Sequence, residues 1–181
     1  MHVRCVAHIL KLIVKKWLSE LNSCIQSIRS AVRYSRSSPQ KLDSFKNCVE
    51  KVKIVSKGLV IMDVPTRWNS TYLMLQSALK FRAAFDRLKD DDSGYESYFT
   101  SDKMVGPPND ADWGNANMFA NFLKPFYDIT LRACCSNTPT IHHAFMDVFK
   151  IFGFLYETNG IKELDSIRGS MQSKYHKYWG T

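Results

Sequence analysis

The sequence predicts a mainly α-helical fold that also contains one or a few strands. Along most of the chain, apolar residues recur at steps of three and four, which is the spacing of one face of an amphipathic helix. A single short apolar run, residues 59–62, has the length of a buried strand instead, and Pro65 ends it because proline has no N–H to donate. With 181 residues, 45% of them hydrophobic, the chain can build one domain with a real core.

The first predicted helix has one apolar face and one basic face. Its apolar face consists of Val6, Leu10, Ile13, Trp17, Leu21, Ile25, Ile28 and Val32. Its basic face carries Lys11, Lys15, Arg29, Arg33 and Arg36 at the same spacing. Such a basic stripe is more often a solvated face than a binding surface, and contact with nucleic-acid phosphates is the alternative.

Cys5 and His8 stand at the head of this helix, at a spacing that places both side chains on one face. Two ligands do not make a zinc site, which needs about three protein ligands for catalysis and four for structure. Taken alone, His8 is a better candidate for a hydrogen-bonded core histidine than for a metal ligand.

The middle of the chain is predicted to alternate short helices with breaks. Residues 35–39 (Ser-Arg-Ser-Ser-Pro) end the first helix, and a second one follows to near Lys53. Beyond the predicted strand, Asn69 or Ser70 is expected to cap a third helix that runs on through Phe85. Residues 89–108 are predicted to be a mobile polar connection and a boundary, because they combine an acidic run with glycines and prolines.

The second half is predicted to be helical throughout. Asn109 or Asp110 can cap a helix in which Pro125 predicts a kink. A further helix is expected to start at Pro139, and a last one carries apolar residues through 164–179.

The positive charge is concentrated in the first third of the chain. Residues 1–60 hold 12 Lys and Arg against three acidic residues, a charge of +9, so the rest of the chain carries −1 of the total of +8. A basic surface favours polyanions as partners. Five cysteines without a C-x-x-C pair are typical of reduced thiols in an intracellular compartment. No run of about 18 apolar residues is present, so no membrane partner is expected.

Arg67 and Trp68 lie together where the apolar run gives way to the third predicted helix. In the structural interpretation, Trp68 is buried and Arg67 covers its ring or pairs with Asp63. In the functional interpretation, Arg67 contacts a phosphate while Trp68 stacks on a base. The position of the pair leaves both interpretations open.

Four sequence blocks resemble a known family. Residues 63–75, Asp-Val-Pro-Thr-Arg-Trp-Asn-Ser-Thr-Tyr-Leu-Met-Leu, are similar to the Arg-Trp segment of the hAT superfamily of DNA transposases, in its plant-type, BED-finger and sleeper-like branch. Residues 4–10 (RCVAHIL), 122–127 (FLKPFY) and 174–179 (KYHKYW) match the same branch in the same order.

The resemblance implies part of a ribonuclease-H-like fold that is interrupted by a helical insertion. It implies that residues 1–88 are the late part of the core, including the Cys-x-x-His and Arg-Trp segments. Residues 89–108 would be a polar linker, and residues 109–181 a helical segment of the transposase. Cys5 and His8 would support the active centre without binding metal themselves.

The resemblance also implies a catalytic site of two Asp and one Glu that hold a divalent metal such as Mg²⁺. In the family, both Asp precede the Cys-x-x-His segment and the Glu follows the insertion, so all three positions are expected to be absent from this chain. No catalytic residue, metal ligand or cofactor is therefore assigned, and independent enzymatic activity is not expected.

The function expected from the sequence is DNA binding in the nucleus by a fragment or a truncated copy of a hAT-like transposase. The expected contacts are Arg67, Trp68, Lys11, Lys15, Arg29 and Arg33. A full-length transposase or further copies of the chain are the other expected partners. The main alternative is a helical protein-interaction module with a solvated basic face, and a third hypothesis is an enzyme whose active centre another chain completes.

Overall fold

A computed structural model of the chain describes residues 22–100 and 105–135, together with the single positions Val14, Met146, Lys150, Gly153, Gly169, Gln172, Ser173 and His176. The described residues form six helices and no strand. By its internal contacts the chain divides into two compact units, one of residues 21–122 and the other of residues 1–20 and 123–181. The mainly α-helical class is confirmed.

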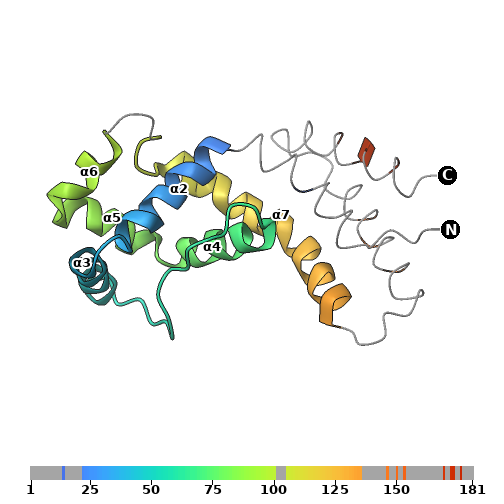
Figure 1. Ribbon diagram of the computed structural model, residues 1–181, viewed down its shortest axis with the longest axis horizontal. Coiled ribbons are helices and arrows are strands. Elements are labelled where there is room, and N and C mark those ends of the chain that lie inside the picture. The colour runs from blue at the N-terminus through green and yellow to red at the C-terminus, as the bar shows by residue number, and fades with distance from the viewer. Residues whose placement is uncertain are drawn as a thin grey trace. The chain divides into compact units, whose positions relative to one another are not determined.

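The unit of residues 21–122 is built from α2 (Asn22–Ser35), α3 (Pro39–Lys51), α4 (Trp68–Lys80), α5 (Arg82–Asp91), α6 (Ser93–Phe99) and the first half of α7 (Asp110–Cys135) (Figure 1). The helix α3 packs against α5, while α2 packs against α3, α4 and α6. The apolar face predicted for the first helix is confirmed where the structure describes it, since Ile25, Ile28 and Val32 are all buried.

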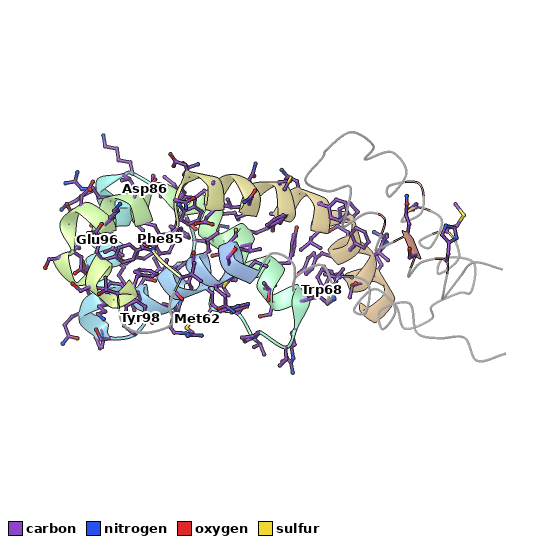
Figure 2. The ribbon with its side chains drawn as sticks, turned by 90° about the horizontal axis from the view of Figure 1, so that it is seen from above. Met62, Trp68, Phe85, Asp86, Glu96 and Tyr98 are labelled. Atoms are coloured by element: carbon purple, nitrogen blue, oxygen red, sulfur yellow. The ribbon has the colours of Figure 1, made fainter. Side chains whose placement is uncertain are left out.

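The core of this unit is aromatic. The ring of Phe85 on α5 lies between the packed helices (Figure 2), 4.7 Å from the ring of Phe45 and 5.8 Å from that of Trp113, centroid to centroid. All three side chains are buried. Aromatic pairs in this tilted geometry contribute about 0.5–1.5 kcal/mol each beyond the area that they bury. The Phe85 ring thereby joins α3, α5 and α7.

The predicted breaks and caps between helices are confirmed at two places. Ser38 is the N-cap of α3, where its Oγ accepts a hydrogen bond from the N–H of Lys41, and Pro39 occupies the first helical position. At the start of α7, Asn109 and Asp112 each accept a hydrogen bond from the other's backbone N–H, which is a reciprocal capping arrangement.

The single helix predicted through Phe85 is two helices. The chain leaves helical geometry at Phe81 (φ −103°, ψ 12°), which ends α4 and precedes α5. The Phe81 ring is buried 5.9 Å from Phe45. The apolar spacing continues across this break, so the pattern alone could not reveal it.

The polar connection predicted at residues 89–108 is wrong for its first part. Residues 93–99 form α6, whose Tyr95 and Phe99 are buried. The acidic run is held in place: Asp91 pairs with Lys51 and Arg87, while Asp92 caps α6 and accepts a hydrogen bond from the Tyr34 hydroxyl (2.8 Å). Burial, followed by the bond to Asp92, raises the pKa of Tyr34 above its usual range.

The strand predicted at residues 59–62 is also wrong. Residues 52–67 connect α3 and α4 through turns at 52–53 and 65–66 and a bend at 57–58, with no strand partner among the described residues (Figure 1). We call residues 59–64, between that bend and the second turn, the extended segment. Only Val60 is fully buried, whereas Ile61 and Met62 remain 48% and 46% exposed. The backbone bonds to side chains instead: the Val60 carbonyl accepts from Arg36 Nη1 (2.6 Å), and the Ile61 N–H donates to Ser77 Oγ (3.0 Å).

The second unit is described mainly through the remainder of α7. Leu123, Phe126 and Ile129 are buried along this part of the helix. Pro125 lies inside α7, and the kink expected there stays a prediction. The helices predicted from Pro139 and through residues 164–179 lie outside the described stretches. No described helix is both long and apolar enough to span a bilayer.

Candidate nucleic-acid interface

The Arg-Trp segment begins with a buried ion pair. The guanidinium of Arg29 on α2 makes a bidentate contact with the carboxylate of Asp63. Its Nε donates to Oδ1 at 2.9 Å and its Nη2 donates to Oδ2 at 2.7 Å. The two side chains are 10% and 3% exposed. Bidentate geometry of this kind is stronger and more directional than a single contact. The pair fixes the end of the extended segment against α2.

The first turn of α4 binds the same segment from its other side. Thr71 Oγ1 donates to Asp63 Oδ2 at 2.9 Å, and Ser70 Oγ accepts from the Val64 N–H at 2.9 Å. The Arg67 N–H donates to the Val64 carbonyl at 2.8 Å, which closes a turn over residues 64–67. We call residues 63–67, held in this way, the arginine turn.

Arg67 occupies the N-cap position of α4 with extended backbone (φ −117°, ψ 102°), and no side chain caps this helix. The cap expected at Asn69 or Ser70 is therefore wrong by two or three residues. The Arg67 side chain is exposed and has no partner among the residues that the structure describes. The expectation that Arg67 pairs with Asp63 is also wrong, because Arg29 occupies that carboxylate.

Trp68 is the first helical residue of α4 and is only 6% exposed. Figure 2 shows it at the beginning of that helix. A base can stack only on an accessible aromatic face, so in this conformation the indole is not a platform for a nucleotide. The structure agrees with the structural interpretation for Trp68 and leaves the functional one to Arg67.

The basic stripe of α2 divides into two kinds of residue. Arg29 and Arg36 both hold the extended segment, at Asp63 and at the Val60 carbonyl. Seven residues of helix rise about 10 Å, and three residues of extended chain span about 10 Å. The segment therefore runs antiparallel along this face of α2. Arg33 lies in sequence between Arg29 and Arg36, the two residues that bind the segment. Its side chain is exposed and has no partner in the described part of the chain.

Arg29 thus does not belong to a solvated stripe, which corrects the sequence expectation. Its Nε and Nη2 are bound to Asp63 and its side chain is only 10% exposed, so little of it is open to a phosphate. Lys11, Lys15, Cys5 and His8 lie outside the described residues. Among the residues that are described, no three His, Cys, Asp or Glu side chains are grouped as metal ligands would be.

Comparison with known proteins identifies the family. The model of the ZBED1 RNase-like helical domain matches residues 3–122. The chain belongs to the hAT-like transposase-related family. The matched region of this family member contains α2 to α6, the arginine turn and the start of α7.

Individual relatives agree with this assignment. Over 98% of its length the chain is 31% identical to the zinc finger BED domain-containing protein RICESLEEPER 4 of Oryza sativa subsp. japonica and 31% identical to the protein named Putative AC transposase of Zea mays. It is 29% identical to RICESLEEPER 2 of the same rice over the same share. The chain spans about a quarter of the length of these relatives, covering 25%, 21% and 24% of them. No solved structure matches the chain.

The sequence interpretation missed Asp63 and Thr71 as the residues that hold the arginine turn. Asp63 was considered only as a partner for the neighbouring Arg67. A signal was present in the sequence, because Asp63 ends an apolar run and is followed by Pro65 and two hydroxyl residues at the start of a helix. Its true partner, Arg29, is 34 residues away, and no local pattern identifies such a pair.

Proposed function

We propose that this chain binds DNA by contacting backbone phosphates at the arginine turn, with Arg67 as the central contact. The observation that carries the proposal is an exposed arginine, without a partner in the described residues, at the N-terminus of a 13-residue helix. The first N–H groups of a helix have no intrahelical partner, and the helix dipole favours an anion there. A guanidinium at the same place adds a full charge and a planar fork that suits phosphate.

Arg33 is the second proposed contact, because it lies on the face of α2 along which the segment of the arginine turn runs. Lys11 and Lys15 stay predicted contacts on sequence grounds alone. The transposase-related family and the BED-finger relatives support DNA as the polyanion and the nucleus as the compartment. Phosphate contacts carry no sequence information, so this surface positions DNA and leaves base recognition to other residues.

The proposal covers binding without catalysis by this chain alone. It assigns no catalytic residue, and among the described residues no three His, Cys, Asp or Glu side chains are grouped as metal ligands would be. Binding through Arg67 would therefore proceed without added Mg²⁺. A mixture of DNA, Mg²⁺ and the chain should show no strand cleavage on a sequencing gel.

A protein-interaction module is the second candidate, and a specific observation favours it. Four large hydrophobic side chains are exposed on the segment before α4, namely Val55, Ile61, Met62 and Val64. Under this alternative, DNA binding would be weak and would not depend on Arg67.

Fluorescence anisotropy with labelled duplex and hairpin-ended DNA tests the proposal. We compare the chain with Arg67→Ala and with Arg82→Ala, a control that also removes one exposed arginine but takes it from α5, where it pairs with Asp110. The slope of log K, the association constant for DNA, against log salt is negative, and one lost phosphate contact makes it shallower by about 0.9. Between 50 and 200 mM salt, the parent should therefore lose about 3.5-fold more affinity than the variant. Equal slopes for the parent and Arg67→Ala would refute the proposal.

A further inference from the structure

We infer that Asp63 is a positioning residue: held between Arg29 and Thr71, it presents Arg67 to a phosphate and never contacts the DNA itself. The inference rests on the proposed function, and it adds a residue for which no DNA-related role is predicted from the sequence. It also gives Arg29 a role different from the one expected of it, because Arg29 acts through Asp63.

The first argument is geometric. The two oxygens of Asp63 accept hydrogen bonds from Arg29 of α2 and from Thr71 of α4, two elements that pack against each other. The carboxylate is therefore the common anchor of both helices and of the chain between them. Four residues later, the bond from the Arg67 N–H to the Val64 carbonyl fixes the backbone that carries the exposed guanidinium.

The second argument is electrostatic. An unpaired carboxylate four residues from Arg67 would attract the Arg67 guanidinium and repel a phosphate approaching it. The Arg29 guanidinium neutralises that carboxylate inside the protein, where the pair is 10% and 3% exposed. The arginine turn then presents the charge of Arg67 alone. Arg29 thus contributes to phosphate binding from a position where little of it is open to a phosphate.

Positioning is separable from general stability because the contacts can be removed one at a time. Thr71→Val keeps the shape of the side chain and removes only the hydroxyl that donates to Asp63. Asp63→Asn keeps the size and removes the charge that holds Arg29. Arg29→Lys keeps the positive charge but cannot make the bidentate contact. Breaking the buried pair also lowers stability, so each variant is first shown to be folded; the buried aromatic side chains of the core are the same in all of them.

The experiment measures DNA affinity against salt for Asp63→Asn, Thr71→Val, Arg67→Ala and the double variant of Asp63→Asn with Arg67→Ala. Asp63→Asn should lower the salt slope by about 0.9, as Arg67→Ala does, because both changes lose the same phosphate contact. The double variant should bind no more weakly than Arg67→Ala alone, since the two residues act in series. Thr71→Val should lie between the parent and Asp63→Asn.

A second readout needs no DNA. Trypsin cleaves after arginine, so the rate of cleavage between Arg67 and Trp68, followed by mass spectrometry, reports how often the arginine turn opens. Asp63→Asn and Thr71→Val should accelerate this cleavage, whereas the control Arg33→Ala should not. Circular dichroism confirms that each variant is folded, and Arg29→Lys and Thr71→Val replace Asp63→Asn if that variant does not fold.

The outcomes distinguish the two proposals. If Arg67→Ala binds DNA with the parent's slope, the proposed function fails and the positioning role fails with it. If Arg67→Ala weakens binding while Asp63→Asn and Thr71→Val match the parent in slope and in cleavage rate, only the positioning role is overturned. Additive losses in the double variant would overturn it as well, because they would mean that Asp63 affects binding independently of Arg67.

Discussion

Replacing Trp68 by alanine separates the two interpretations of the Arg-Trp pair. The indole is 94% buried, the complement of its 6% exposure. A tryptophan buries about 150–250 Å², which at about 25 cal/mol per Å² corresponds to about 4–6 kcal/mol. Measured Trp→Ala changes in cores cost about 3–5 kcal/mol, because the site relaxes in part. We therefore expect Trp68→Ala to lower the free energy of unfolding by about 3–5 kcal/mol.

The assay is urea denaturation followed by far-ultraviolet circular dichroism, with Arg67→Ala as the matched neighbour. Arg67 is exposed and has no partner in the described residues, so its removal should change stability by no more than about 0.5 kcal/mol. An exposed stacking platform would behave in the opposite way. Trp68→Ala would then be as stable as the parent and would lose about 1–3 kcal/mol of affinity for hairpin-ended DNA. That result would refute the assignment of Trp68 to the core.

Three further predictions concern the pair, a cap and a thiol. Arg29→Ala leaves the Asp63 charge buried with one hydroxyl partner, so it should lower the free energy of unfolding in urea by about 3–5 kcal/mol. The control Arg33→Ala removes an exposed arginine and should cost about 0.5 kcal/mol or less. Similar losses for both variants would mean that the Arg29–Asp63 pair does not stabilise the fold. Asn109→Ala should lower the melting temperature through loss of about 1 kcal/mol of capping, and no shift would mean that the cap contributes nothing. Burial raises the pKa of the Cys24 thiol to about 12, so iodoacetamide at pH 8 should label it far more slowly than in the urea-unfolded chain, with a rate that rises with pH up to about 12.

The sequence predicted local features of the helices well and long-range ones poorly. The break at residues 35–39 and the cap at Asn109 were predicted because a serine before proline, or an asparagine before a helix, acts on its immediate neighbours. The division between α4 and α5 was missed because the buried Phe81 continues the apolar spacing through a change of direction. Only its contact with Phe45, 36 positions earlier in the chain, distinguishes the two cases.

The extended segment illustrates why an apolar run is ambiguous. Residues 59–62 have the composition of a strand, yet a strand also needs a partner that supplies hydrogen bonds. Here Arg36 and Ser77 bind the backbone at Val60 and Ile61. A side chain of α4 and one from the turn after α2 thus supply hydrogen bonds that a neighbouring strand would otherwise supply. Nothing within the run itself indicates which kind of partner it meets.

Arg67 and Trp68 were predicted from the sequence as a pair. That Trp68 is buried while Arg67 is exposed was not predicted. Arg67 has extended backbone before the helix and Trp68 is the first helical residue, so their side chains leave the chain in different directions. One of two neighbours can therefore be buried while the other is exposed, as Trp68 and Arg67 are. Which of them faces the core depends on the helices that surround α4, and this information is spread over the whole unit.

The basic stripe shows that counting charges overestimates a binding surface. Arg29 and Arg33 of α2 and Arg36 just after it have the spacing of one face, and the net charge of +8 includes each of them. Arg29 is neutralised by Asp63, and Arg36 is tied to a carbonyl of the extended segment. Arg36 keeps its charge, because a carbonyl is neutral, but one of its donors is occupied; Arg33 and Arg67 are the exposed arginines here without a partner among the described residues. Each neutralised phosphate adds about 0.9 to the magnitude of the slope of log K against log salt. Arg33 and Arg67 together should therefore contribute about 1.8, whereas Arg29 should contribute nothing directly.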